Sequence, residues 1–491
     1  MKVVNVNLRN ALLLFKQKNY LGAKVAFLEL IKKTEVDPKL YYTLYQIFNN
    51  LNELNNAKKY LIKFLEFEKK NHVALNNLAN LYLKKKEFNK AEVSYLKAID
   101  YKKDYLTAIL NLALYYQGAG NIILAKKFYN KGIELSPKNL GIYFNLNKID
   151  QNFLNEKRIK FINTLLKKEK LDEFSMACGY FLIAENKKKN KKYEKEIESL
   201  KIAHKHAFNF SQKYNEQSVK YWLDIMPKKY NKIQYISSSG NEQNKKELSP
   251  IFIIGLPRSG STIVETIISS GKEKILNLGE TNLINWSLVS TYKKILFNNK
   301  EQDDLLIEAK IIEEKLFSAL NNLNGFNPEI KLFTEKSLEN FFYIDLILKI
   351  FPKAKFIHTF RNTQDNVFAI FQKFLTNLSW THSLENILSY VDNYLKIINI
   401  FKKKYPNKIL SISLEKLTEK NKDITKNIYK FCGIEWSDQA LEFYKRKDLF
   451  SNTASNIQIR SKLQKYDYEK YKPYKQFLKK FSSKYQWIDQ D

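Results

Sequence analysis

The stretch that decides the fold is IFIIGLPRSGSTIVETIISS, residues 251–270. Its first four residues are β-branched or aromatic, which is typical of a buried strand. A glycine-containing turn at 255–260 separates this strand from apolar residues spaced as on one face of a helix. Proteins of the α/β class build anion sites in this order of elements, because backbone N–H groups converge there and the helix dipole adds positive potential.

The turn departs from the usual nucleotide-binding loop at one position. Gly255 and Gly260 have the spacing of a P-loop, but the lysine expected after the second glycine is Ser261. A basic residue, Arg258, lies inside the loop instead. We therefore expect the loop to hold a phosphate-like group in a protein that is not an ordinary ATPase.

Composition favours a reduced protein of several domains. A chain of 491 residues is too long for one core, so two or three domains are expected. No apolar run reaches the roughly 20 residues of a membrane span, and the N-terminal residues lack the layout of a secretory signal. The two cysteines make neither a disulfide framework nor a zinc set. A cytoplasmic location fits these features, and the sequence allows an oligomer.

The net charge of +32 raises the question of nucleic-acid binding. Lysine is interspersed with Asn and Ile along the whole chain and is concentrated in no single element. We attribute this pattern to coding bias and expect anionic substrates or membrane surfaces rather than nucleic acid. Only six of the 83 basic residues are arginine, so arginine marks positions where a planar fork has to grip phosphate or carboxylate.

The first 145 residues repeat with a period of 34. Ala23, Ala57, Ala91 and Ala125 follow one another at this spacing. Small residues at fixed positions let paired helices approach closely, while aromatic residues fill the gap to the next pair. The pattern resembles tetratricopeptide repeats and predicts an α-solenoid. The concave groove of such a solenoid could bind a peptide or a partner protein. Alternatively, the repeats could act as a spacer or a dimerisation element, and the sequence leaves both alternatives open.

Strands and helices alternate after the polar segment SSSGNEQNKKELSP at 237–250. Strands are expected at 251–254, 331–334, 355–360 and 408–414, with helices at 340–351 and 384–405. This alternation predicts a parallel sheet with helices on both faces. The expected organisation is tetratricopeptide repeats at 1–145, degenerate helical repeats and a linker at 146–247, and an α/β P-loop-like domain with a central parallel sheet at 248–491.

Two motifs resemble the donor site of sulfotransferases, which use 3′-phosphoadenosine 5′-phosphosulfate (PAPS). GLPRSGST at 255–262 resembles their 5′-phosphosulfate loop, with the basic residue at Arg258. RNTQDNVFAIFQKF at 361–374 resembles their 3′-phosphate motif, in which Arg361 matches the family arginine. The family serine eight residues later is Ala369 here, and a lost hydrogen bond to a charged group costs roughly 1.5–3 kcal/mol. Lys373, one helical turn further, is placed to supply charge instead.

Three further segments resemble the same family. NLGET at 277–281 is similar to the Gly-Glu element of tyrosylprotein sulfotransferases, which implies that Glu280 is the catalytic base. TEKS at 334–337 resembles the acidic-Lys element, which implies that Lys336 contacts the transferred sulfonate. NTASNIQIR at 452–460 resembles a loop that closes over the donor. Repeats followed by such a domain look like a known bacterial arrangement.

The resemblance implies a sulfotransferase that moves sulfonate from PAPS to an acceptor hydroxyl, releases adenosine 3′,5′-bisphosphate and needs no metal. The implied catalytic residues are Glu280, Arg258 and Lys336. The implied donor-binding residues are Pro257, Arg258, Ser259, Gly260, Ser261, Thr262, Arg361, Ala369, Lys373, Ser455, Gln458 and Arg460.

Several alternatives stay open at this point. A protein tyrosine or another peptide-borne hydroxyl is the favoured acceptor, while glycans, lipids and small metabolites are equally compatible with the sequence. A P-loop kinase that uses ATP and a repeat scaffold with an inactive transferase domain are rival functions. His358 is a second candidate base, although a packed structural role is the preferred interpretation. His204 and His206 lie on a basic helix and are expected in solvent.

Overall fold

The computed structural model describes residues 2–33, 37–236, 248–297, 305–327, 329–446, 448–451, 453 and 455–490. The chain divides into two compact units. One consists of Met1–Tyr116, Ile123–Ser136 and Lys315–Asn327, and the other of Gln117–Ile122, Pro137–Glu314 and Pro328–Asp491. Most of the predicted linker lies outside the described residues, and the predicted boundaries at 145 and 247 stay predictions.

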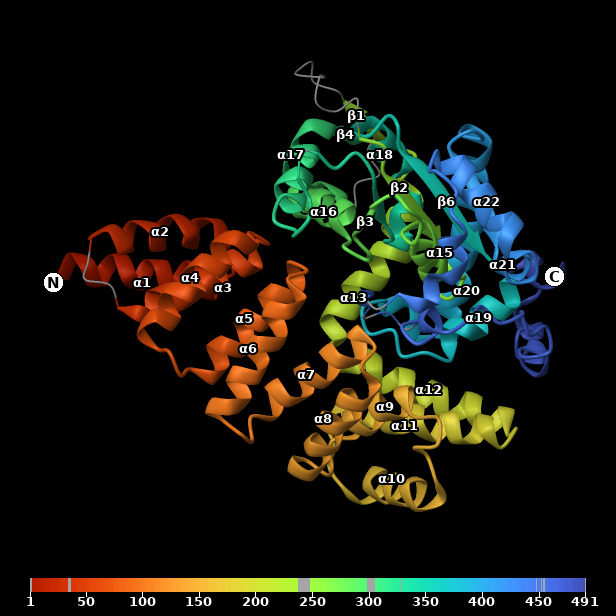
Figure 1. Cartoon of the computed structure of the whole chain (residues 1–491), viewed down its shortest axis with the longest axis horizontal. Helices are drawn as coiled ribbons and strands as arrows, with labels where there is room; N and C mark the ends of the chain where they lie inside the picture. Colours follow the sequence, from red (N-terminus) through yellow and green to blue (C-terminus); the bar gives the residue numbers. More distant parts are fainter. Residues whose placement is uncertain are drawn as a thin grey trace. The chain divides into compact units, whose positions relative to one another are not determined.

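Paired α-helices make up the start of the chain, coloured red to orange in Figure 1. They are α1 (Lys2–Lys16), α2 (Tyr20–Lys33), α3 (Pro38–Asn50), α4 (Leu54–Phe67), α5 (His72–Lys84), α6 (Phe88–Tyr101), α7 (Leu106–Ala119) and α8 (Ile122–Leu135). After the first helix of each pair comes one residue with positive φ: Lys18, Asn52, Lys86 and Gly120. A left-handed residue there ends a helix and turns the chain. The same turn therefore recurs every 34 residues, and the predicted helical repeat is confirmed.

Packing inside the first unit follows the repeat. The four alanines of the 34-residue series are fully buried: Ala23, Ala57, Ala91 and Ala125. Their methyl groups leave room for the helices of a pair to approach closely. Hydrogen bonds also join equivalent helices, from the Asn77 amide to the Tyr42 hydroxyl (2.8 Å) and from Lys84 Nζ to Asn49 Oδ1 (2.9 Å).

A segment from far along the chain completes this unit. Lys85 Nζ donates to the Asn322 carbonyl oxygen (2.7 Å), and the Asn324 amide donates to the Lys85 carbonyl oxygen (2.9 Å). Residues 315–327 therefore belong to the repeats by packing, although the sequence places them beyond the predicted start of the α/β domain.

More helices follow in the second unit, in the region where degenerate helical repeats and a linker were expected at 146–247. These helices are α9 (Leu140–Ile149), α10 (Glu156–Lys168), α11 (Glu173–Lys189), α12 (Tyr193–Asn209), α13 (Gln212–Lys220), the π-helical turn η1 (Tyr221–Ile225) and α14 (Met226–Lys229). The last described residues of this region form a strand that sequence reasoning missed, β1 (Ile233–Ile236), paired in parallel with β4 (Leu305–Glu308).

A five-stranded parallel sheet is the centre of this unit, which confirms the predicted parallel sheet and adds one strand, β3, to the four that were expected. Its strands lie in the order β3 (Leu276–Asn277), β5 (Phe333–Glu335), β2 (Ile251–Gly255), β6 (Lys355–Phe360) and β7 (Ile409–Ser413). Phe252 of β2 pairs with Phe356 of β6, which in turn pairs with Ile409 of β7. β2 therefore lies at the middle of the sheet, with its carboxyl end between those of β5 and β6.

Helices cover both faces of the sheet, because the strand residues that point to one face and those that point to the other are both mainly apolar. Ile253 lies in one apolar cluster with Val264 of α15 (Ser261–Ile268) and Ile428 of α22 (Asn421–Cys432). Phe252 points the other way, where the 3₁₀ helix η2 (Leu338–Tyr343) and α20 (Leu384–Lys404) lie. The remaining helices are α16 (Leu283–Leu296), α17 (Ala309–Leu320), α18 (Ile344–Ile350), α19 (Thr363–Phe371) and α21 (Leu414–Glu419). In sheets of this kind ligands bind beyond the carboxyl ends of the strands.

Candidate active site

The turn from β2 into α15 has an unusual backbone. Gly255 has a φ of 147°, and a Cβ atom there would come within 2.3 Å of the Thr359 carbonyl oxygen. Gly260 has a φ of 92°. Arg258 adopts a φ of 70° although it is not glycine. A non-glycine residue held in this region costs on the order of 1–3 kcal/mol and is typical of functional sites.

Hydrogen bonds from neighbouring strand and helix ends hold this loop. Ser259 Oγ donates to the Leu256 carbonyl oxygen (2.7 Å) and lies 2.8 Å from the Thr359 hydroxyl. The Asn366 amide donates to the Pro257 carbonyl oxygen (2.7 Å). Since β6 and α19 supply these partners, the loop is fixed to the centre of the sheet, and α15 starts directly after it with two buried residues, Ser261 and Thr262.

The Arg258 side chain reaches the segment that was predicted to close over a donor. Its Nη1 donates to Ser455 Oγ (2.6 Å) and its Nη2 to Gln458 Oε1 (3.4 Å). These partners lie about 200 residues further along the chain, so only the fold brings them together. Both are neutral, and neither compensates the positive charge of Arg258.

Arg361 follows β6 and lies beside the same loop. Its Nε and Nη2 donate to the hydroxyl oxygen of Tyr466 (3.1 and 2.5 Å), and its Nη1 lies 3.5 Å from the Arg258 carbonyl oxygen. The Tyr466 hydroxyl donates to Asp365 Oδ2 (2.6 Å). Sequence reasoning missed Tyr466, because it stands in irregular backbone 105 residues after Arg361 and in none of the motifs.

Two lysines add positive charge to this part of the site. Desolvation by the surrounding protein, followed by the charge of Arg258, lowers the pKa of Lys373 to about 8. Desolvation and then the charges of Arg361 and Arg258 also lower the pKa of Lys470. Both lysines are nevertheless exposed at the surface, so the protein atoms around their ammonium groups lower the pKa without closing these groups off from a ligand. Cations that depress one another's pKa in this way favour a bound anion, because it relieves their repulsion.

Ala369 lies in α19 between Arg361 and Lys373 and is 3 % exposed. Its methyl group offers no hydrogen bond, as the sequence indicates. Helices α11 and α12 hold the end of α19. Gln372, directly after α19, accepts a hydrogen bond from Lys188 (2.5 Å) and donates one to Glu196 (2.9 Å). Helices α11 and α12 thereby fix the position from which Lys373 extends.

A second group of residues lies at the ends of β3 and β5. The Lys336 ammonium is fully buried and donates to the carboxylate of Glu280, which is 52 % exposed. Main-chain bonds from Lys336 to Gly279 and from Leu278 to Thr334, both 2.9 Å, extend the strand pairing to this point. Burial opposes the charged form of Lys336, but Glu280 and then the other carboxylates nearby outweigh it and raise the pKa of the lysine.

Three more carboxyl groups surround this pair. Glu335 accepts hydrogen bonds from Thr281, Ser337 and Asn340, which explains its burial. Glu265 accepts from the Gly279 amide (3.1 Å). Neither Glu265 nor Glu339 was predicted from the sequence. Burial, together with the charges of Glu280 and Glu335, raises the pKa of Glu339 to about 7.

Arg460 makes main-chain contacts. Its Nη2 donates to the carbonyl oxygens of Gly118 (2.5 Å) and Leu449 (2.9 Å), and burial lowers its pKa. The guanidinium therefore secures the segment that carries Ser455 and Gln458. A direct role for Arg460 in donor binding stays a prediction.

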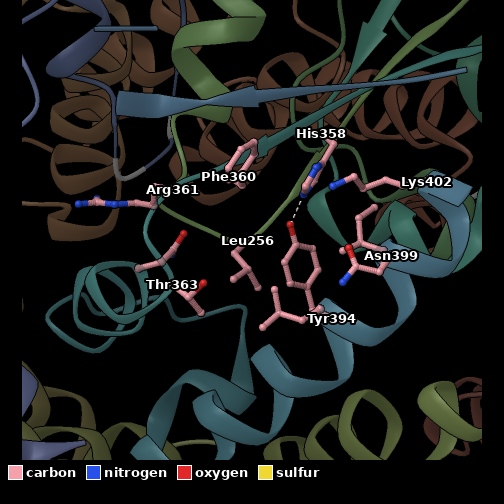
Figure 2. A pocket seen from close by; sticks show the side chains of 11 residues that line it. Leu256, His358, Phe360, Arg361, Thr363, Tyr394, Asn399 and Lys402 are labelled. Carbon is pink, nitrogen blue, oxygen red and sulfur yellow. Dashed lines mark hydrogen bonds between the residues drawn. The ribbon is translucent and has the colours of Figure 1, made fainter. Parts of the chain in front are cut away.

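His358 is buried in β6 beside a cavity of about 120 Å³ (Figure 2). Its two ring nitrogens bond to the hydroxyl groups of Ser411 (3.0 Å) and Tyr394, and burial lowers its pKa to about 3. Figure 2 shows Arg361 at the rim of this cavity, with its guanidinium pointing away from His358. These contacts support the structural interpretation of His358.

The prediction that His204 lies in solvent is wrong. Its ring is 1 % exposed, with Nε2 at 2.7 Å from the Phe371 carbonyl oxygen and Nδ1 at 3.2 Å from Nδ1 of His382. Helix α12 packs against the end of α19 and the 3₁₀ turn η3 (Ser379–His382), and this tertiary contact is not visible in the charge pattern of the helix. His206, on the same helix, is partly exposed and lies 2.9 Å from Glu173.

In the part of the chain that the structure describes, neither a metal site nor a membrane span is present. There, no three His, Cys, Asp or Glu side chains are grouped so that they could hold a metal ion. Among the same residues, no helix has the length and apolar character to cross a bilayer.

Comparison with known proteins agrees with this architecture. Residues 250–438 match the sulfotransferase family, and residues 72–105 and 106–139 each match a tetratricopeptide repeat. The first match contains all five strands of the main sheet together with Arg258, Glu280, Lys336 and Arg361. The chain thus carries tetratricopeptide repeats followed by a sulfotransferase-family domain.

Individual relatives are distant. An uncharacterized protein of Aquifex aeolicus is 24 % identical over 335 residues, which are 66 % of this chain and 43 % of that protein. This chain therefore spans less than half the length of that relative. Part of a repeat protein from Cytophaga hutchinsonii is 18 % identical, with 44 % of this chain and 86 % of that one covered and a TM-score of 0.33. The sulfotransferase domain of the Synechococcus PCC 7002 olefin synthase is 16 % identical, with 43 % and 83 % covered and a TM-score of 0.31.

Proposed function

We propose that this protein transfers a sulfonate group from PAPS to an acceptor hydroxyl, because residues 250–438 form a sulfotransferase-family domain. The observation that carries the proposal is the meeting of Arg258 and Arg361 at the loop, where Arg361 Nη1 lies 3.5 Å from the Arg258 carbonyl oxygen. The charges of these arginines also act on Lys373 and Lys470. A donor with a 5′-phosphosulfate and a 3′-phosphate brings several negative charges close together. Such a donor would relieve the repulsion within this cluster.

The two anionic groups of the donor have separate candidate binding sites. The 5′-phosphosulfate would be bound by the loop residues Pro257 to Gly260 and by the start of α15, with Ser261 and Thr262, because a helix N-terminus favours an anion. Arg361 suits the 3′-phosphate, because its planar fork matches phosphate oxygens. Lys373 and Lys470 are accessible and supply further charge at this end. Ser455 and Gln458 hold the Arg258 side chain over the loop.

Glu280 and Lys336 suit the transfer step. In this proposal the acceptor oxygen forms a bond to sulfur while the bond from sulfur to the bridging oxygen breaks, and adenosine 3′,5′-bisphosphate leaves. Glu280 accepts the proton of the acceptor hydroxyl, which its exposure allows. Lys336 and Arg258 stabilise the charge on the transferred group and on the leaving oxygen. No step requires a metal ion.

The acceptor is proposed as a protein tyrosine or another peptide-borne hydroxyl. The exposed face of Glu280 can be reached by a side chain of a larger molecule, and tetratricopeptide repeats precede the domain. Solenoids of this type offer extended surfaces for binding. The repeats are accordingly proposed as the part that binds the acceptor protein.

Binding of adenosine 3′,5′-bisphosphate to the purified full chain tests the function. Calorimetry in EDTA should show binding that magnesium does not improve and that excess ATP does not prevent. Binding of ATP that depends on magnesium, with no binding of the bisphosphate, would instead identify a kinase. Transfer is then measured with PAPS labelled with sulfur-35 and tyrosine-containing peptides, and bisphosphate binding without transfer to any hydroxyl acceptor would indicate an inactive scaffold.

A further inference from the structure

The guanidinium of Arg361 is held mainly along one edge, with one long hydrogen bond from Nη1 to the donor loop. Its Nε and Nη2 both donate to the Tyr466 hydroxyl oxygen, at 3.1 and 2.5 Å. The other end, with Nη1, faces the donor loop, where the Arg258 carbonyl oxygen lies 3.5 Å away. An arginine has five N–H donors in a fixed plane. The Nη1–Nη2 end is therefore directed toward the loop, while the Nε–Nη2 edge is occupied.

Two aromatic rings restrict the same side chain. The Arg361 Cζ atom lies 4.8 Å from the ring centre of Tyr466 and 5.1 Å from that of Tyr471. A guanidinium is attracted to aromatic faces at this distance. The Arg361 side chain is only 9 % exposed, so the segment that carries both tyrosines forms a wall of its site.

The Tyr466 hydroxyl also separates Arg361 from Asp365. It donates to Asp365 Oδ2 at 2.6 Å, whereas Arg361 Nη2 remains 3.8 Å from that oxygen. This Nη2–Oδ2 separation is too long for a hydrogen bond. The Asp365 carboxylate is a charged acceptor and therefore competes directly with phosphate for a guanidinium. The phenol oxygen therefore lies between the two charged groups, which form an ion pair at 3.8 Å without a direct hydrogen bond.

We propose that Tyr466 is a positioning residue that keeps the Nη1–Nη2 end of Arg361 directed toward the donor loop, where it can bind the 3′-phosphate of the donor, and so sets the preference for a 3′-phosphorylated nucleotide. The inference depends on the proposed function. Tyr466 also supplies a hydroxyl group beside Arg361, whereas Ala369 supplies none. This hydroxyl comes from the C-terminal segment rather than from α19, so the donor site is complete only with that segment in place.

The test compares two nucleotides on variants of the full chain. Adenosine 3′,5′-bisphosphate and adenosine 5′-monophosphate differ only in the 3′-phosphate, and calorimetry measures both affinities. Tyr466→Phe keeps the ring and removes the hydroxyl. It should weaken the bisphosphate by roughly tenfold or more and leave the monophosphate unchanged. In turnover it should raise the KM for PAPS with little change in kcat.

Tyr468→Phe is the matched control. Tyr468 lies in the same segment but is exposed, and its hydroxyl bonds to Glu419 (2.7 Å). This variant should bind both nucleotides as the unaltered protein does. Thermal unfolding of each variant shows whether it folds.

A second variant separates positioning from simple packing. Adding Asp365→Asn to Tyr466→Phe removes the competing carboxylate, so the double variant should regain most of the lost bisphosphate affinity. A purely structural role for Tyr466 would give further loss instead. The inference is overturned if Tyr466→Phe binds the bisphosphate within about twofold of the unaltered protein, or weakens both nucleotides equally. Unaltered protein that binds neither nucleotide overturns the proposed function as well, which distinguishes the two failures.

Discussion

The ammonium of Lys336 donates a hydrogen bond to the carboxylate of Glu280 between the carboxyl ends of β5 and β3. The lysine is fully buried, whereas the glutamate side chain is 52 % exposed. A fixed cation is thus joined to a carboxylate that a molecule from solvent can reach. This relationship places the acceptor at Glu280 and the transferred group near Lys336 in the proposed reaction.

Replacing Glu280 with glutamine should stop proton removal while keeping the shape of the side chain. We expect turnover to fall by roughly 10²–10⁴-fold, the usual range for a lost general base. Binding of adenosine 3′,5′-bisphosphate should be unchanged, because Arg258 and Arg361 do not contact Glu280 through any described bond. Steady-state kinetics and calorimetry measure the two properties. Turnover close to that of the unaltered protein would exclude Glu280 as the base.

Arg361→Ala should remove the proposed seat of the 3′-phosphate. Hydrogen bonds to charged groups are worth roughly 1.5–3 kcal/mol each, which corresponds to a loss of bisphosphate affinity of about 10–100-fold or more. Calorimetry with adenosine 3′,5′-bisphosphate measures the effect. Arg9→Ala, an exposed arginine of α1, is the control and should bind normally. Unchanged affinity in Arg361→Ala would show that the motif at 361–374 does not hold the donor.

Donor binding should depend on pH through Lys373. Desolvation and the charge of Arg258 lower the pKa of this lysine to about 8. Above that pH the free site loses the charge, so bisphosphate affinity should decrease by up to about tenfold per pH unit. The bound anion favours protonated lysine, so binding near pH 8 should take up protons. Calorimetry in Tris and in HEPES, which differ in ionisation enthalpy, measures this uptake.

Lys373→Met should abolish both the pH dependence and the proton uptake. Lys396→Met is the control, because Lys396 is 71 % exposed and pairs with Asp392. Proton uptake that persists in Lys373→Met would assign it to another group.

Glu339 should make the fold less stable as the pH rises. Burial raises its pKa from 4.5 to about 7, so the folded state binds a proton that the unfolded state has already lost. Its contribution to stability is therefore full below about pH 4.5 and is lost as the pH rises to about 7. Glu339→Gln keeps a neutral side chain at every pH. The Tm of this variant should exceed that of the unaltered protein more at pH 8 than at pH 5.

The exposed Glu314 is the control for this measurement. Glu314→Gln should shift Tm equally at both pH values. An equal shift for Glu339→Gln would show that Glu339 is ionised in the folded protein throughout.

Gly255→Ala should damage the loop without changing any polar group. The new methyl group would lie 2.3 Å from the Thr359 carbonyl oxygen, and backbone atoms would have to move. We expect a lower Tm and loss of bisphosphate binding. Gly22→Ala in α2 meets only the flexible Asn19 side chain at 3.1 Å, and alanine favours a helix by about 1 kcal/mol over glycine. That control should unfold at the same temperature or higher.

Much of the fold could be predicted because its signals are local. The strand, glycine turn and helix of residues 251–268 follow directly in the chain, and buried alanines recur at each repeat. Short pairings such as β3 and the parallel pair β1 and β4 were missed. Their two to four residues carry little pattern, and their partners lie far away in sequence.

The candidate site shows the same division. Arg258, Glu280, Lys336 and Arg361 were predicted from motifs that lie at strand ends. Lys336 and Arg361 directly follow β5 and β6, and Arg258 and Glu280 lie in the loops after β2 and β3. Glu339 carries no pattern of its own, and its pKa depends on charges from other elements. His204 was wrongly expected in solvent, because the charge pattern of its helix does not reveal that this helix packs against the end of α19.

The sequence by itself determined the repeat, the parallel α/β domain and the presence of an arginine inside an anion loop, because helix periodicity, strand patterns and glycine turns depend on neighbouring residues. Only the tertiary structure decided what surrounds that arginine. It placed Ser455 and Gln458 on Arg258, and Tyr466 between Arg361 and Asp365, across about 100 to 200 residues of chain. Such contacts have no local signal, since they arise when strand ends and an irregular C-terminal segment meet at one edge of the sheet.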